Sequence, residues 1–289
     1  MSSPRHLVTA ATGQLGRLVV AELLQRVPAS DIAVAVRDPA RAADFAAQGV
    51  NVRQADYTDA TSLQTAFAGI ERVLLISSNA VGQRSVQHRN AITAAKAAGV
   101  GLVAYTSLLH ADRSPLGLGE EHRDTEAALR DSGLPFALLR NGWYTENITG
   151  GVAHEVSRGV RAGSAGEGRF STATRANYAA AAAIVLTADN AAGQVYELAG
   201  DDSYTLDEYA ATVSRLSGKP VRYENLSEAD YRQVLLDAGL PPPVASLLAD
   251  SDAGAAQGGL FDDSRTLSRL IGRPTTPLET TLRAALSQG

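Results

Sequence analysis

A glycine-containing turn near the N-terminus is the strongest chemical signal in this sequence. Residues 8–16 read VTAATGQLG, which follow a short apolar run and open an amphipathic stretch. Glycine at a strand-to-helix turn lets the backbone approach a pyrophosphate, and the first turn of the helix offers free N–H groups and positive dipole charge. The context therefore predicts a dinucleotide site, with a ligand-free turn as the alternative.

One position departs from the usual glycine pattern. Ala10 stands where Gly-x-x-Gly-x-x-Gly has its first glycine. If φ is positive there, the alanine Cβ costs about 1–2 kcal/mol. If φ is negative, alanine is tolerated and only crowds the ligand. Both conformations remain open from the sequence, whereas Gly16 is expected to let the helix pack closely on the sheet.

Arg37 is the candidate that selects between the two nicotinamide dinucleotides. It ends the second apolar run, about 20 residues beyond the motif, where NAD-binding proteins place an acid for the ribose 2′-hydroxyl. A guanidinium there can bind a 2′-phosphate through paired, charge-assisted hydrogen bonds. The sequence thus favours NADP(H), although Asp38 follows directly and a solvated arginine is the alternative.

Polar side chains stand at the ends of three further predicted strands. Asp56 is a candidate acceptor for the adenine amino group, or equally a cap for the next helix. Ser77, Ser78 and Thr106 are candidates to line the ribose and nicotinamide, because ligands of parallel sheets lie outside the carboxyl ends of strands. Small hydroxyl residues are also common in turns, which is the alternative for these three.

The elements that position these residues alternate between strand and helix. Strands are predicted at 6–10, 31–36, 50–55, 72–77, 101–107 and 135–140, and helices at 14–26, 39–48, 62–67, 84–98 and 120–132. Leu15, Leu18, Val19 and Leu23 fall on one face of the first helix. Such alternation builds a doubly wound parallel sheet of the Rossmann type, an α/β fold.

The second half has a different pattern, which predicts a smaller, mainly helical C-terminal lobe. A glycine-rich polar region at 149–171 precedes a helix at 174–187 and a strand at 195–198, and a further strand is possible at 221–225. Helices follow near 206–216, 228–238, 243–248 and 278–286. We expect an NADP(H)-binding domain over 1–150, with 174–200 contributing, and a lobe over 151–289 that covers the substrate.

Composition narrows the function further. The net charge is −5, which provides no electrostatic footprint for nucleic acid or an anionic membrane. The chain has no cysteine, and its five histidines show no ligand-like pairing with carboxylates, so we expect no metal. Neither a signal peptide nor an apolar stretch of membrane-spanning length is evident, which predicts a soluble, cytoplasmic protein that does not bind membranes. A homo-oligomer is possible.

Several segments resemble the NmrA-like atypical short-chain dehydrogenases, and among them the bacterial NAD(P)H:quinone oxidoreductases. They are residues 8–16, 75–78, 104–110, 139–147, 258–264 and 271–276, so the similarity covers nearly the whole chain. The resemblance implies NADPH binding and quinone reduction without flavin. It places cofactor contacts on Arg37, on the end of the fourth strand, and on Ala10, Ala11, Thr12, Gly13, Gln14, Leu15, Asn141, Gly142, Trp143 and Tyr144.

The usual catalytic acid of short-chain dehydrogenases is missing. Where those enzymes carry Tyr-x-x-x-Lys, this chain has His122 and Glu126, which could pair one turn apart or lie on a solvated helix face. Reduction of an ordinary carbonyl needs an acid for the developing alkoxide. A quinone becomes an aromatic hydroquinone anion that water can protonate later, so it demands less. No catalytic residue is predicted.

Three side chains are candidates for contact with a quinone-like substrate. Trp143 and Tyr144 could stack on a planar ring, and Tyr144 or His110 could donate to a quinone oxygen. Trp143, the only tryptophan, could instead plug the interface between the domains. A redox sensor that binds NADP(H) without turnover and regulates a partner protein fits the missing acid equally well.

Overall fold

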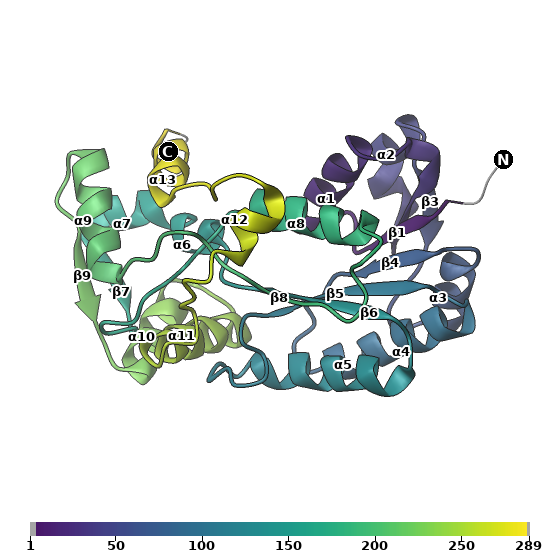
Figure 1. The fold of residues 1–289 in the computed structure, drawn as a ribbon. Coiled ribbons are helices and arrows are strands. Elements are labelled where there is room, and N and C mark those ends of the chain that lie inside the picture. The colour runs from purple at the N-terminus through teal and green to yellow at the C-terminus, as the bar shows by residue number, and fades with distance from the viewer. Residues whose placement is uncertain (1–3, 288–289) are drawn as a thin grey trace. The chain divides into compact units, whose positions relative to one another are not determined.

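The fold is built on one large, mostly parallel sheet. The computed structural model describes residues 4–287. The sheet has the order β3-β2-β1-β4-β5-β6-β8, in which β1 pairs in parallel with both β2 and β4 (Figure 1). Its strands are β1 His6–Thr9, β2 Ile32–Val36, β3 Asn51–Gln54, β4 Arg72–Leu75, β5 Leu102–Leu108, β6 Phe136–Asn141 and β8 Val195–Leu198. This order confirms the predicted Rossmann-type α/β fold, with the topological switch point at β1 and β4.

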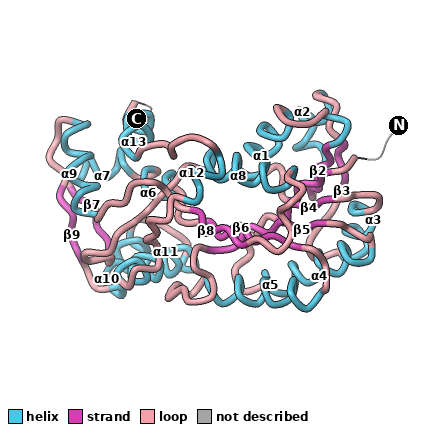
Figure 2. Tube along the Cα trace, in the orientation of Figure 1, coloured by secondary structure: helices cyan, strands magenta, loops and turns pink. Residues whose placement is uncertain are grey.

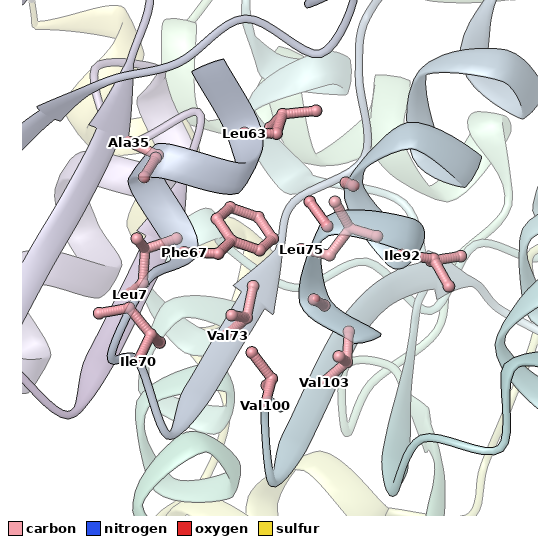
Figure 3. Close-up of a cluster of buried hydrophobic side chains, with 14 of the residues drawn as sticks. Leu7, Ala35, Leu63, Phe67, Ile70, Val73, Leu75, Ile92, Val100 and Val103 are labelled. Carbon is pink, nitrogen blue, oxygen red and sulfur yellow. The ribbon is translucent and has the colours of Figure 1, made fainter. Parts of the chain in front are cut away.

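Helices cover both faces of this sheet, as parallel strands require. Helices α1 (Gln14–Leu24) and α8 (Arg175–Thr187) pack together on one face, and α3 (Ala60–Phe67), α4 (Arg84–Ala97) and α5 (Gly119–Ser132) cover the other (Figures 1 and 2). Strands β1, β2 and β4 are rich in β-branched residues and leucine and are almost wholly buried, whereas the edge strand β3 is partly exposed. A cluster of such side chains joins the sheet to α3 and α4 (Figure 3). Its labelled members include Leu7, Leu63, Phe67, Val73, Leu75, Ile92 and Val103.

The first helix buries a slightly different face from the predicted one. Leu15, Val19 and Leu23 are buried as expected, but Leu18 is 36% exposed. The buried residues include Gly16 and Val20 instead, and α1 packs against α8. Small side chains permit this close approach, and α8 is itself rich in alanine.

Most predicted elements of the first half are present. The exception is the predicted helix at 39–48, which is not one continuous α-helix. The stretch 39–48 forms a 3₁₀ turn, Pro39–Ala42, followed by the short helix α2, Ala43–Ala47. Asp38 caps the turn, since its side chain accepts from Ala40 N at 3.0 Å. A further 3₁₀ turn, Ala29–Asp31, precedes β2.

The glycine-rich polar region at 149–171, in which no element is predicted from the sequence, contains regular structure. This region contains α7 (Val152–Arg158) and β7 (Val160–Gly163), joined at Gly159, whose φ of 68° reverses the chain in a conformation that glycine adopts freely. Strand β7 pairs in parallel with β9 (Arg222–Asn225), which confirms the possible strand there. A four-residue strand has too little periodicity to be predicted alone, because its partner lies far along the chain.

The remaining elements are helical, as predicted for the C-terminal region. They are α6 Thr145–Thr149, α9 Leu206–Ser217, α10 Glu228–Asp237, α11 Pro242–Ala256, α12 Thr266–Ile271 and α13 Leu278–Leu286. Helix α11 is longer than expected, and α6 and α12 were not predicted. Helices α11 and α12 contain glycine or serine positions that weaken a helical pattern, and tertiary packing outweighs this local preference.

By their internal contacts the residues fall into two compact units. Unit 1 comprises the described residues up to Leu108, Glu120–Arg140 and Arg175–Tyr196. Unit 2 comprises Leu109–Gly119, Asn141–Thr174 and the described residues from Glu197 onward. The expected division into 1–150 with 174–200, and 151–289, stays a prediction about domains.

Candidate functional site

The turn after β1 has the backbone geometry that a phosphate requires. Gly13 N donates to Ala10 O at 3.0 Å, and Gly13 is the N-cap of α1 in an extended conformation. Among residues 4–287, no side chain caps this helix end, so the N–H groups of its first turn remain available to a ligand. Ala11 and Leu15 are buried, which leaves only their backbone to face a phosphate.

Ala10 adopts the strained alternative. Its φ is 49°, so an L-residue occupies the left-handed region that glycine prefers. The missing glycine is therefore a real departure from the pattern, with its cost in backbone strain. Gly16 meets the expectation of close packing: a Cβ there would lie 2.6 Å from Ala10 O and 2.7 Å from Ala11 Cα.

Arg37 and Asp56 line one pocket of about 620 Å³ at the carboxyl ends of β2 and β3. The pocket is lined by Arg37, Arg53, Gln54, Ala55, Asp56, Asp59, Ser62, Thr65 and Ala66. The guanidinium of Arg53 is engaged within the protein, because its Nη1 donates to Ala66 O and Ala68 O at 2.6 and 2.8 Å. Arg37 is exposed at the pocket, which leaves it suited to a 2′-phosphate.

Asp56 forms a local turn rather than a helix cap. Its Oδ1 accepts from Thr58 N at 2.8 Å and from Thr58 Oγ1 at 2.7 Å, and these hydrogen bonds lower the pKa of the Asp56 carboxyl. The cap of α3 is Asp59, which accepts from Thr61 N and Ser62 N. Asp56 is therefore ionised at neutral pH and lines the pocket as an acceptor.

The hydroxyl groups at the ends of β4 and β5 have unequal roles. Thr106 is buried, and its Oγ1 accepts from Ser77 N at 2.8 Å. Ser107 is also buried and donates to Glu126 Oε1 at 2.7 Å. Ser77 is partly exposed, whereas Ser78 is mostly buried and its Oγ accepts from Ala80 N. The Thr106 hydroxyl thus binds the backbone of Ser77. The predicted contact of the Thr106 hydroxyl with a ligand stays a prediction.

His122 and Glu126 stand on α5 where the tyrosine and lysine of short-chain dehydrogenases are missing. Both side chains are buried, and they bond to other residues rather than to each other. His122 is 5% exposed, and its Nδ1 lies 2.7 Å from the Tyr105 hydroxyl. Glu126 is 1% exposed and accepts from Arg140 through Nε and Nη2. The predicted solvated helix face is wrong, because β5 and β6 supply partners that the helix sequence does not show.

The chain leaving β6 is fixed by backbone contacts. Asn141 O accepts from Leu109 N at 2.9 Å, and Gly142 N donates to Leu198 O at 2.8 Å. Asn141 is 6% exposed, and its Oδ1 is buried with no hydrogen-bond partner within residues 4–287. An orphaned acceptor at the carboxyl end of a parallel strand fits an amide donor from a ligand.

Trp143 and Tyr144 follow directly and differ in exposure. Trp143 is 9% exposed, and its carbonyl accepts from Ala173 N at 3.3 Å. Tyr144 is half-buried, forms a bridge with Ala173, and is the N-cap residue of α6. Tyr144 is therefore the more accessible of the two aromatic rings predicted to contact a substrate.

His110 is held between two carboxylates of unit 2. Its Nδ1 lies 3.5 Å from Glu197 Oε2 and its Nε2 3.5 Å from Asp262 Oδ2, while Phe261 O lies 3.2 Å from Nε2. The hydrogen bond with Glu197 is the largest influence and raises the pKa of His110. Sequence reasoning missed both carboxylates, although Asp262 lies in one of the segments that carry the family resemblance.

Neither a metal site nor a membrane-spanning helix is found among the described residues. Within residues 4–287, no group of three or more histidine and acidic side chains is arranged to hold a metal ion. In the same part of the chain, every helix is too short or too polar to span a bilayer.

The features above fit a dinucleotide, and comparisons with known proteins agree. The sequence model of the NAD(P)H-binding family matches residues 10–189. Quinone oxidoreductase 2 of Escherichia coli strain K12 is 57% identical over 271 residues, which span 94% of this chain and 95% of that protein.

Solved structures are similar over the same extent. The NADPH-dependent quinone oxidoreductase of Escherichia coli complexed with NADPH has a TM-score of 0.95 and 56% identity, covering 96% of this chain and 99% of that chain. The triphenylmethane reductase of Citrobacter sp. complexed with NADP(H) has a TM-score of 0.93 and 38% identity, covering 97% and 99%. The predicted family resemblance is confirmed: this chain belongs to the NAD(P)H-binding family.

Proposed function

We propose that this protein is an NADPH-dependent reductase that passes a hydride directly to quinones or similar electrophilic acceptors. Support comes from the similarity to quinone oxidoreductase 2 and from a site suited to NADP(H). The cofactor, when bound, supplies the hydride. The residues of the chain bind it, orient it and hold the acceptor.

The observation that carries the acceptor class is the burial of His122 and Glu126. Both α5 side chains are bonded to partners inside the protein, so neither is placed to act as the acid for a reacting oxygen. A ketone would leave an alkoxide with its charge on one oxygen, which needs a proton donor. A quinone leaves a hydroquinone anion whose charge is delocalised, so orientation against the nicotinamide suffices and water supplies the proton afterwards.

Different residues of the chain bind different parts of the cofactor and the acceptor. The first turn of α1 holds the pyrophosphate, Arg37 the 2′-phosphate, and Asn141 offers its orphaned Oδ1 to an amide donor. Trp143 and Tyr144 remain the proposed wall for a planar acceptor. His110 is less suited to donate to the acceptor than its sequence position suggests, because its ring nitrogens face Glu197 and Asp262.

The test follows NADPH absorbance with a benzoquinone, a naphthoquinone and a simple ketone as the matched control. We expect consumption of NADPH with the quinones and none with the ketone. Equal rates with the ketone would contradict the argument from the missing acid. Tight NADPH binding with no quinone turnover would favour a redox sensor instead, and a sensor should also separate NADPH from NADP⁺ by affinity.

A further inference from the structure

The backbone that leaves β4 is held by side chains from three other segments. Ile76 N donates to Thr9 Oγ1 at 3.0 Å, and Ile76 O accepts from the Tyr57 hydroxyl at 2.8 Å. Ser77 N donates to Thr106 Oγ1 at 2.8 Å. Buried backbone groups that leave a sheet need new partners, and here each bond comes from a side chain. The Ile76–Ser78 segment is therefore held by side-chain hydrogen bonds.

His88 on α4 completes this set of bonds. Ser78 N donates to His88 Nε2 at 3.0 Å, and His88 is fully buried. On its other side, Nδ1 lies 2.9 Å from Thr125 Oγ1, whose own proton goes to Glu121 O at 2.9 Å. Since the threonine oxygen must then accept, the ring carries its proton on Nδ1 and keeps Nε2 free to accept from Ser78.

The surroundings keep this imidazole neutral. Burial, with a smaller contribution from the nearby Arg84, lowers the pKa of His88 to about 4. Arg84 also binds the same segment, because its Nε donates to Ser78 O. Two aromatic rings, Tyr57 and Tyr105, meet the imidazole edge-on and limit its rotation. The His88 ring is thus neutral, and its Nε2 is held pointing toward Ser78 N.

The location of this segment connects it with the reaction. In this sheet β1 lies between β2 and β4. The carboxyl end of β4 therefore lies beside the turn that follows β1, at the switch point where parallel sheets bind dinucleotides. We propose that His88 is a positioning residue, which holds Ile76–Ser78 as a rigid surface for the nicotinamide end of the cofactor. This role rests on the proposed function.

The test compares three variants by their dissociation constants for NADPH, measured from its fluorescence, and by steady-state kinetics with a quinone. His88→Asn is too short to reach Ser78 N, whereas His88→Gln can place its Oε1 near the position of Nε2. His122→Asn is the matched control, since His122 is also buried but bonds Tyr105. We expect His88→Asn to weaken NADPH binding about tenfold and leave the KM for quinone unchanged, with His88→Gln restoring affinity and His122→Asn preserving it.

Three outcomes decide the matter. Unchanged NADPH affinity in a folded His88→Asn variant, or an equal loss in His122→Asn, would show that His88 only packs the core. If His88→Asn does not fold, Thr125→Val takes its place, because it removes the acceptor that fixes the tautomer; unchanged affinity there overturns the proposal. If the wild-type protein binds NADPH but reduces no quinone, the proposed function fails, and the dissociation constants still decide the role of His88.

Discussion

The carboxylate of Glu126 accepts from both Nε and Nη2 of Arg140, at 2.9 and 2.8 Å, and both side chains are buried. The pair joins α5 to β6 at the helix position where related dehydrogenases carry their catalytic lysine. Breaking a buried ion pair by removing one charge costs about 3–5 kcal/mol, because the other charge stays buried without compensation.

Glu126→Gln should therefore lower the free energy of unfolding by about 3 kcal/mol or more, measured by urea denaturation. The matched control is Arg130→Gln, which removes a half-exposed partner of the same carboxylate and should cost less than about 1 kcal/mol. Quinone turnover of the folded Glu126→Gln variant should equal that of the wild type. A loss of turnover without a loss of stability would give Glu126 a chemical role that its burial argues against.

Arg37→Ala should weaken NADPH binding about tenfold or more and leave NADH binding unchanged. The reason is that a charge-assisted hydrogen bond to a 2′-phosphate contributes roughly 1.5–3 kcal/mol, and NADH has no such phosphate. Calorimetric titration with both dinucleotides measures the effect. Arg89→Ala, an exposed arginine on α4, is the control. Equal weakening for NADPH and NADH would remove the basis for the NADP(H) preference.

Ala10→Gly should stabilise the protein by about 0.5–1 kcal/mol. Glycine relieves the left-handed strain of φ 49°, worth about 1–2 kcal/mol, and part of this gain is lost to the greater freedom of glycine in the unfolded chain. Thermal unfolding measures the change. Ala11→Gly, at a neighbouring buried position without positive φ, should destabilise instead. The same sign for both substitutions would contradict the strain argument.

His110 should make stability depend on pH in a defined direction. Its pKa in the folded protein is raised, chiefly by Glu197, above the value of about 6.5 in the unfolded chain. The contribution of the ion pair is therefore fully present below about pH 6.5 and is lost as pH rises through the folded pKa. The difference in unfolding free energy between wild type and His110→Gln should be larger at about pH 6 than at about pH 9.

The control for this pH dependence is His154→Gln, which changes an exposed histidine of the same unit. Its difference from the wild type should not vary with pH in this way. An unchanged difference for His110→Gln at the two pH values would show that the imidazole is neutral in the folded protein and that its contacts with Glu197 and Asp262 are not ionic.

Much of unit 1 was predictable because its signals are local. The strand-to-helix turn at Thr12–Gly16 and the apolar strands of the first half specify a parallel sheet through short-range patterns. The rules of connection in such a sheet then place the phosphate turn and the ends of β2 and β4 at one edge. These signals predict the dinucleotide site, and Arg37 stays the predicted contact for a 2′-phosphate.

Only the tertiary structure decided which polar side chains are free to act. His122 and Glu126 are four residues apart on α5, yet their partners Tyr105 and Arg140 lie on separate strands, and no pattern along the helix reveals those bonds. The same holds for His88, whose bond to Ser78 depends on the packing of α4 against the sheet. Local sequence sets backbone preference and amphipathic faces, whereas hydrogen-bond partners distant in sequence are determined when the core closes.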